Sequence, residues 1–260
     1  MRYKIGWGEA LLEKSITTML IINADDFGKN HICTDRILSC FQKRRVTSTS
    51  AMMFMEDSER FAELALENDI DIGLHLNFTS KFNGNMKSGN LNEYQQDIAA
   101  FLLKSKYFQF VYNPLLKKQF DYLFKAQYEE HLRLFKRVPT HIDGHRHLHL
   151  CMNMILPGII PAGLKVRRNF TFAPGEKDPF NRCYRYVVDK WLKRKYKTTD
   201  YFFDIVPIQF QRLRQIIEVA KSSTVEIMVH PERSDEYDYL MGDEYLQIIS
   251  SIRKISYATL

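Results

Sequence analysis

The chain has 260 residues, of which 45% are hydrophobic, with a formal net charge of +6 and an isoelectric point of about 9.0. This length and apolar content fit one large α/β domain and exclude a mini-protein or a disordered chain. The mild basic charge without a nucleic-acid motif argues against a nucleic-acid partner, and no apolar run is long enough to span a membrane.

The first predicted strand begins at Met19, and residues 1–18 contain no apolar core of the kind found in signal peptides. We therefore expect residues 19–260 to form a single domain, with residues 1–18 as an N-terminal extension that need not be native. The four cysteines form no C-x-x-C pair and are interpreted as reduced, small hydrophobic residues. Together these features predict a cytoplasmic protein.

The first third of the chain alternates between strand and helix patterns. Residues 19–22 form an apolar run, and residues 32–41 carry apolar residues at helical spacing before a basic stretch. Residues 46–54 are rich in Thr, Ser and Val, Ser58 can cap a following helix, and residues 69–78 alternate strictly. This rhythm predicts parallel βα units.

The remaining two thirds continue that rhythm less regularly. Residues 81–92 read as a loop, and a long helix is expected from about Pro114 to Arg137. A fourth strand precedes a histidine-rich stretch, and further apolar runs lie at 164–166 and 225–229. With no internal repeat and no long linker, the predicted fold class is α/β, as a single-domain parallel barrel or barrel-like fold.

The most informative stretch is His141-Ile142-Asp143-Gly144-His145-Arg146-His147-Leu148-His149, with four histidines and one aspartate at every second position. Neutral imidazole and carboxylate are preferred ligands of zinc and related divalent ions. In an extended chain the outer histidines would lie about 26 Å apart, so one ion cannot use all of them. We expect a strand that ends near Gly144, one or two metal ligands, and substrate-binding or supporting roles for the others. Asp143 can accept a hydrogen bond from a ligand imidazole.

Parallel α/β folds place their active sites at the carboxyl ends of the strands. Metal-binding or acid/base residue types follow or end four predicted strands: Asp25, Asp26, His75, His145 and His230. Each residue alone has an ordinary structural interpretation, such as helix capping or core packing. Their joint occurrence at strand ends predicts a shared site.

The chain resembles the YdjC-like carbohydrate deacetylases, a family that includes chitooligosaccharide deacetylase. The resemblance covers about residues 19–235 and rests on five motifs in the family's order: Asn23-Ala24-Asp25-Asp26-Phe27-Gly28, Val46-Thr47-Ser48-Thr49, Gly73-Leu74-His75-Leu76, the stretch from Thr140 to His149, and Val229-His230-Pro231. It implies a distorted (β/α) barrel related to polysaccharide deacetylases. It also implies one divalent metal ion, magnesium or zinc, and a homodimer.

By motif position, the resemblance implies Asp26, His75 and His145 as metal ligands. Asp25 would then be the catalytic base and His230 the acid. The supporting or substrate-binding residues are predicted to be His141, Asp143, His147 and Arg167, the last of which matches a family arginine only loosely. The chain departs from the family pattern at Lys29-Asn30-His31, where Leu-Ser is typical.

The activity implied by this resemblance is hydrolysis of the N-acetyl group of an acetylated amino sugar or oligosaccharide, with release of acetate. Two other classes fit the same residues: a metal-dependent phosphoesterase, and a non-catalytic sugar-binding protein on the same scaffold. The basic stretch Lys190–Lys197 is expected to be a solvated helix face, although a lipid-linked substrate near a membrane would also use it. The particular sugar and its chain length are left open.

Overall fold

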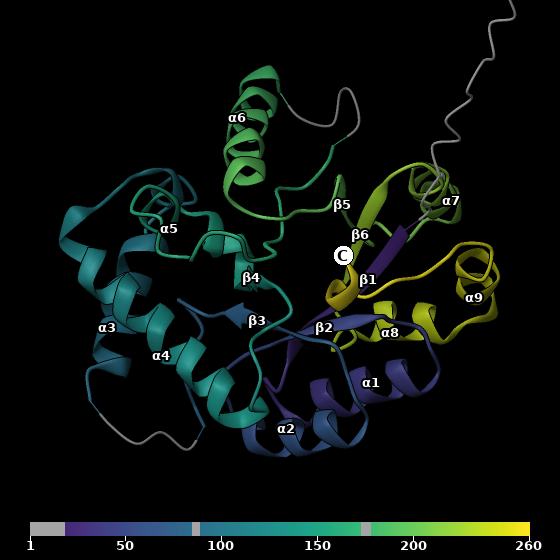
Figure 1. Cartoon of the computed structure of the whole chain (residues 1–260), viewed down its shortest axis with the longest axis horizontal. Helices are drawn as coiled ribbons and strands as arrows, with labels where there is room; N and C mark the ends of the chain where they lie inside the picture. The colour runs from purple at the N-terminus through teal and green to yellow at the C-terminus, as the bar shows by residue number, and fades with distance from the viewer. Residues whose placement is uncertain (1–18, 85–88, 173–177) are drawn as a thin grey trace, which may run out of the picture.

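The computed structural model describes residues 19–84, 89–172 and 178–260, so the proposed extension 1–18 lies outside the described residues. Six parallel strands form one curled sheet in the order β4-β3-β2-β1-β6-β5 (Figure 1). The strands are β1 (Met19–Phe27), β2 (Ser48–Ala51), β3 (Ile72–Leu76), β4 (Ile142–Gly144), β5 (Tyr201–Asp204) and β6 (Thr224–Val229). The predicted single-domain distorted α/β barrel is confirmed.

The central strands are buried along almost their whole length. Every residue of β6 and all of β1 except Met19 are buried, as expected for parallel strands covered on both faces. Their Val, Ile and Leu residues favour extended backbone and fill the core. The buried polar residues among them therefore need a specific explanation, which the candidate site provides.

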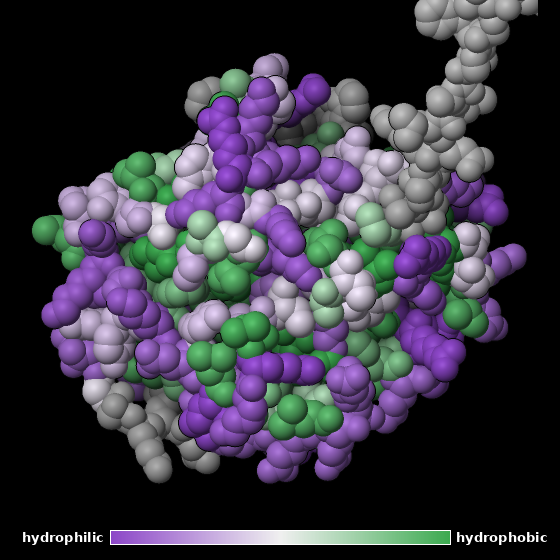
Figure 2. Space-filling model, in the orientation of Figure 1, coloured by the Kyte–Doolittle hydropathy of each residue, from purple (hydrophilic) through white to green (hydrophobic). Residues whose placement is uncertain are grey.

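Nine α-helices occur in the described part of the chain. They are α1 (His31–Gln42), α2 (Ser58–Glu67), α3 (Leu91–Leu102), α4 (Lys117–Phe135), α5 (Met152–Ile155), α6 (Pro179–Lys195), α7 (Phe210–Ala220), α8 (Ser234–Met241) and α9 (Asp243–Ile249). Helix α4 buries Phe120, Leu123 and Phe135, as its apolar spacing predicts. Helix α6 stands apart from the others at one end of the molecule, and hydrophilic side chains cover much of it (Figures 1 and 2). No helix among the residues described is long and apolar enough to cross a membrane.

The barrel is not closed by a regular strand between β4 and β5. Residues 165–171 bridge this seam instead: Arg167 N donates to Ile142 O at 3.0 Å, and Thr171 N donates to Phe202 O at 2.7 Å. The apolar run at 164–166 therefore forms only isolated bridges, one of which pairs Val166 with Ile142. This irregular segment carries the arginine that matters most to the site.

The C-terminal segment runs back along the central strand. Leu20 N donates to Arg253 O at 3.2 Å, and Ile255 N donates to Leu20 O at 2.9 Å. Tyr257 is fully buried as a result and stacks on the ring of His141 with centroids 3.7 Å apart. The side chain of Tyr257 thus reaches the interior of the barrel.

Candidate metal centre

Two consecutive aspartates face the same cavity because the end of β1 is irregular. The register between β1 and β2 shifts between Ala24 and Phe27, and Asp26 has a φ of 70°. In a regular strand successive side chains point to opposite faces, whereas a bulge redirects one of them. Positive φ at a non-glycine residue costs on the order of 1–3 kcal/mol and is typical of functional sites. Here it brings both Asp25 and Asp26 to the cavity.

Asp26, His75 and His145 come together as the sequence predicts. Oδ1 of Asp26 lies 3.2 Å from Nε2 of His75 and 3.1 Å from Nδ1 of His145, and the three candidate ligand atoms lie within 4.8 Å of one another. Ligands held about 2.0–2.2 Å from one ion have comparable mutual separations. Burial raises the pKa of Asp26, but hydrogen bonds with His145 and His75 outweigh it and hold that pKa well below its usual range. The donor set fits a divalent metal ion.

The second nitrogen of His75 is held by a buried carboxylate. His75 and Asp143 are register partners on β3 and β4, and Nδ1 of His75 lies 2.8 Å from Oδ1 of Asp143. The hydroxyl of Ser50 donates to Oδ2 of Asp143 at 2.9 Å. A carboxylate behind a ligand imidazole fixes the ring and leaves the other nitrogen for a metal. Burial lowers the pKa of His75, but Asp143, Asp26 and Asp25 outweigh it and raise that pKa to about 10 when no metal competes for the site.

Asp25 is held in a single orientation by an arginine. The guanidinium of Arg167 donates to both carboxylate oxygens, at 2.6 and 2.7 Å, and Asn23 Nδ2 donates to Oδ1 at 2.9 Å. This two-pronged pairing restricts the carboxylate more than a lysine would. The predicted base therefore sits at the cavity with its position fixed from behind.

Arg167 is fully buried and serves three carboxylates. Besides Asp25, it lies 2.7 Å from Oδ2 of Asp143 and donates through Nε to Oε1 of Glu226 at 2.8 Å. Burial lowers its pKa, but the three carboxylates outweigh that effect and hold it well above the usual value. The hydroxyl of Tyr257 donates to the other oxygen of Glu226. Burial raises the pKa of Glu226 to about 7 despite Arg167 and this hydrogen bond.

His230 follows β6 and lines the same cavity as Asp25 and Asp26. Its backbone N donates to Oε2 of Glu236 at 2.6 Å, and its Nδ1 lies 3.7 Å from Oε1 of the same side chain, an ion-pair distance. Burial lowers the pKa of His230, but the carboxylates of Glu236, Asp25 and Asp26 outweigh it and raise that pKa. The imidazole is therefore suited to carry a proton near neutral pH.

The departure from the family pattern at residue 29 places a cation beside the candidate metal ligands. Nζ of Lys29 lies 3.4 Å from Oδ2 of Asp26 and 2.5 Å from Oε2 of Glu232. Asn30 donates to the other oxygen of Glu232 at 2.8 Å and caps α1 by accepting from Cys33 N. Lys29 and Glu232 thus form one wall of the cavity.

The four histidines between residues 141 and 149 have different surroundings. The strand ends at Gly144, and His145 turns toward Asp26. His147 is half-buried, has a φ of 57° and lines the cavity beside Phe170, with ring centroids 4.4 Å apart. Burial, with the charge of Arg167, lowers its pKa well below the usual value, so its ring is neutral.

His141 and His149 do not line the cavity. His141 packs between Tyr257 and Gly73, where an added Cβ would lie 2.3 Å from the imidazole. Nε2 of His149 lies 3.0 Å from the backbone O of Arg167 and supports the seam segment. Of the four predicted supporting residues, Asp143 and Arg167 hold the site from behind, His147 reaches the cavity, and His141 belongs to the packing beneath it.

The site also contains residues that the sequence analysis did not select. They are Asn23, Lys29, Ser50, Glu226, Glu232, Glu236 and Tyr257. A charged residue inside the apolar run Thr224–Val229 was a visible signal for Glu226. Tyr257 gave no such signal, because its partners are brought to it only by the return of the C-terminal segment.

Asp25, Asp26, His75, His145, His147 and His230 all line one cavity of about 480 Å³ at the carboxyl ends of the strands. The fold and the site together define the class of protein: a parallel α/β barrel enzyme with a cluster of aspartate and histidine side chains at the carboxyl ends of its strands. The chain belongs to the YdjC-like protein family, whose sequence profile matches residues 19–257.

The chain is also similar to several individual proteins. A carbohydrate deacetylase of Clostridium beijerinckii is 30% identical over 218 residues, which cover 82% of this chain and 80% of that protein. A chitooligosaccharide deacetylase of Proteus mirabilis is 30% identical over 138 residues, which cover 51% of this chain and 50% of that protein. A crystal structure from Enterococcus faecalis V583, described as a candidate cellobiose-phosphate cleavage protein, superposes with a TM-score of 0.68 at 19% identity, covering 93% of this chain and 98% of that one. This last likeness concerns the fold.

Proposed function

We propose that this chain is a metal-dependent hydrolase that removes the N-acetyl group from an acetylated amino sugar or oligosaccharide and releases acetate. The observation that carries the proposal is the convergence of Asp26, His75 and His145 with Asp25 and His230 around one cavity. The names of the similar proteins support the carbohydrate amide as the substrate class.

Asp26, His75 and His145 would hold one divalent ion, zinc or magnesium. A bound ion of this kind acts as a Lewis acid toward a carbonyl and lowers the pKa of a water molecule. Two imidazoles and one carboxylate form a donor set that catalytic zinc uses, while magnesium prefers oxygen ligands. We therefore favour zinc.

The protein's own groups supply the proton transfers. Asp25, fixed by Arg167, takes a proton from the attacking water and thereby acts as the general base. His230, whose pKa is raised by Glu236 and the two aspartates, donates a proton to the departing amine nitrogen. Each such group contributes about 10²–10⁴-fold to a rate. His147 and Phe170 in the cavity wall would contact the sugar.

Acetate release is the decisive measurement. The purified chain is depleted of metal, reloaded with zinc or magnesium, and incubated with N-acetylglucosamine oligosaccharides of increasing length. We expect metal-dependent release of acetate, and a loss of about 10³-fold or more for Asp26→Asn and for His145→Ala with retained circular dichroism. Metal content measured on the same samples should fall in both variants.

A panel of phosphate esters separates this proposal from the phosphoesterase class. Turnover of phosphate esters without acetate release would contradict the deacetylase assignment. Binding of oligosaccharides without any turnover in the metal-loaded protein would instead favour a non-catalytic sugar-binding protein.

A further inference from the structure

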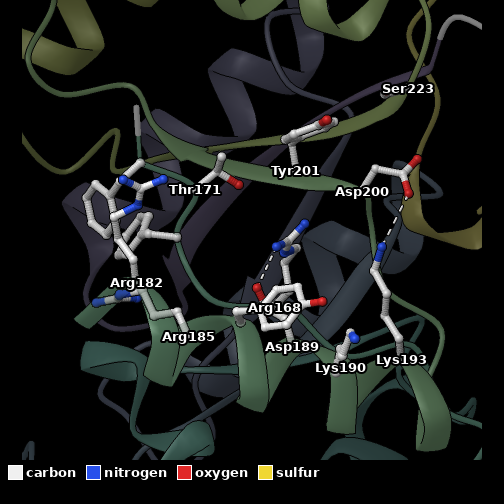
Figure 3. A pocket seen from close by; sticks show the side chains of 13 residues that line it. Arg168, Thr171, Arg182, Arg185, Asp189, Lys190, Lys193, Asp200, Tyr201 and Ser223 are labelled. Atoms are coloured by element: carbon white, nitrogen blue, oxygen red, sulfur yellow. Dashed lines mark hydrogen bonds and ion pairs between the residues drawn. The ribbon is translucent and has the colours of Figure 1, made fainter. Parts of the chain in front are cut away.

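A second cavity lies on the outer side of the barrel wall, between α6 and β5. Its volume is about 650 Å³, within the range of about 300–1,000 Å³ that is usual for small-molecule sites. Figure 3 shows its lining side chains, most of which come from α6 and from residues 168–172, with Asp200, Tyr201 and Ser223 on the other side. It shares only Phe170 with the cavity of the metal centre. We call it the α6 groove.

Cations outnumber carboxylates in the α6 groove. Its charged residues are Arg168, Arg182, Arg185, Lys190 and Lys193 against Asp189 and Asp200. The two carboxylates are already engaged: Arg168 lies 2.5 Å from Asp189, and Lys193 lies 3.6 Å from Asp200. Among the described residues, no carboxylate forms an ion pair with Arg182, Arg185 or Lys190, so the groove retains an excess of positive charge.

Arg185 is fixed in place without being neutralised. Its Nε donates to Oδ1 of Asn181 at 2.7 Å, Nη1 lies 3.5 Å from Oδ1 of Asn169, and the guanidinium lies over the ring of Phe172 at 4.9 Å. Amide oxygens orient a guanidinium but do not cancel its charge. Burial lowers the pKa of Arg185, only partly opposed by Asp189, as expected for a cation that lacks a full counter-charge.

Arg182 lies one helical turn before Arg185 on α6, so the two side chains share a face. Both are at the same end of the groove as Thr171 in Figure 3, while Lys190 is farther along the helix. Aromatic rings of Phe172, Tyr186 and Tyr201 complete the walls. Guanidinium groups are the side chains best suited to the charge and hydrogen-bonding pattern of a phosphate group, and aromatic walls favour a ring-shaped or apolar body.

We propose that the α6 groove binds a phosphate-bearing ligand, distinct from the acetylated sugar at the metal centre, through Arg182, Arg185 and Lys190. The ligand phosphate belongs either to a soluble phosphorylated compound or to a phospholipid head group. The groove is close enough to the metal centre for both ligands to contact Phe170, whose ring stacks on Phe202 with centroids 4.6 Å apart. The binding itself does not require a metal.

Binding is tested on the whole chain after treatment with a chelator, so that phosphate cannot bind through a metal ion. Isothermal titration uses inorganic pyrophosphate as the soluble probe, and co-sedimentation uses phosphatidylcholine vesicles with and without phosphatidylglycerol. We expect saturable binding of at least one probe, weakened about tenfold or more in the double variant Arg182→Gln/Arg185→Gln, because two charge-assisted contacts are removed. The variant Lys190→Gln should weaken it less.

The double variant Lys117→Gln/Lys118→Gln is the matched control, since both lysines are exposed on α4 and outside the groove. It removes the same charge and should change affinity less than twofold. Pyrophosphate binding without vesicle binding assigns the ligand to the soluble class, and vesicle binding that pyrophosphate displaces assigns it to a head group. Absence of binding to both probes, or equal weakening by the two double variants, would overturn the proposal. Melting temperatures identify any variant that is misfolded, and Lys190→Gln then serves as the test.

Discussion

The candidate metal centre and the α6 groove differ in the burial and pairing of their charged side chains. In the barrel interior, Arg167 forms ion pairs with Asp25, Asp143 and Glu226, and each of these four residues is at most 2% exposed. In the groove, Arg182 and Lys190 are exposed and lack carboxylate partners among the residues described. Buried charges need partners with fixed geometry, because an unpaired buried charge is very costly. Exposed cations remain available to a ligand. The interior network therefore fixes the position of Asp25, the proposed base, whereas the groove is suited to binding.

The largest expected difference between the two regions concerns stability. Replacing Arg167 by Met leaves three buried carboxylates without their counter-charge, which should lower the free energy of unfolding by about 3–5 kcal/mol. Replacing Lys193 by Met in the groove removes an ion pair with Asp200 in which the side chains are 50% and 51% exposed. This change should alter the free energy of unfolding by about 1 kcal/mol or less. Urea titrations of both variants measure the contrast. Similar losses for the two would show that the interior network is no more important to stability than the surface pair.

A smaller loss of stability is expected at Tyr257, which is linked to Arg167 through Glu226. Tyr257→Phe removes the hydroxyl that donates to Glu226 but keeps the ring that stacks on His141. Loss of one buried hydrogen bond to a charged acceptor should cost about 1.5–3 kcal/mol of stability. It should also loosen Arg167 and hence Asp25, so that kcat for acetate release falls while KM changes little.

Tyr245→Phe is the control for that variant, because Tyr245 is equally buried but donates to the backbone O of Arg45 at 3.0 Å, away from the centre. An equal fall of kcat in both variants would indicate a general loss of stability instead of a positioning role for Tyr257.

The pH dependence of activity should report the environment of His230. Glu236 raises the pKa of His230, so Glu236→Gln lowers it. A general acid must be protonated to act, so activity is lost as pH rises through this pKa. The alkaline limb of the kcat profile should therefore move to lower pH in Glu236→Gln, while the acidic limb stays in place. A shift to higher pH, or an unchanged alkaline limb, would argue against His230 as the acid.

The smallest effect is expected at Lys29, whose ammonium is near Asp26. Replacing it by Leu, the residue typical of the family at this point, removes a repelling cation close to the metal ligands. Because the Lys29 side chain is 28% exposed and also paired with Glu232, we expect only a several-fold gain in zinc affinity, measured by competition with a chelator. A loss of affinity would indicate that Lys29 instead holds Asp26 in position.

Much of the fold was predictable because its signals are local. Apolar runs and alternation located five of the six strands, and helical spacing located α4 to within a few residues. Strand β5 was missed because Tyr201–Asp204 is only four residues long and its first residue is exposed. The apolar run at 164–166 forms only isolated bridges, which no local pattern distinguishes from a regular ladder.

The sequence by itself determined which chemistry is present, because it fixed which strands end in aspartate or histidine and which family motifs surround them. The tertiary structure alone decided which of those groups meet. It separated His141 from His145 although they are four residues apart, and it joined Asp25 to Arg167 although they are 142 residues apart. The physical reason is that contacts between buried charges depend on strand register, on the bulge at Asp26 and on the return of the C-terminal segment. These are properties of the whole sheet and cannot be read from any single stretch of residues.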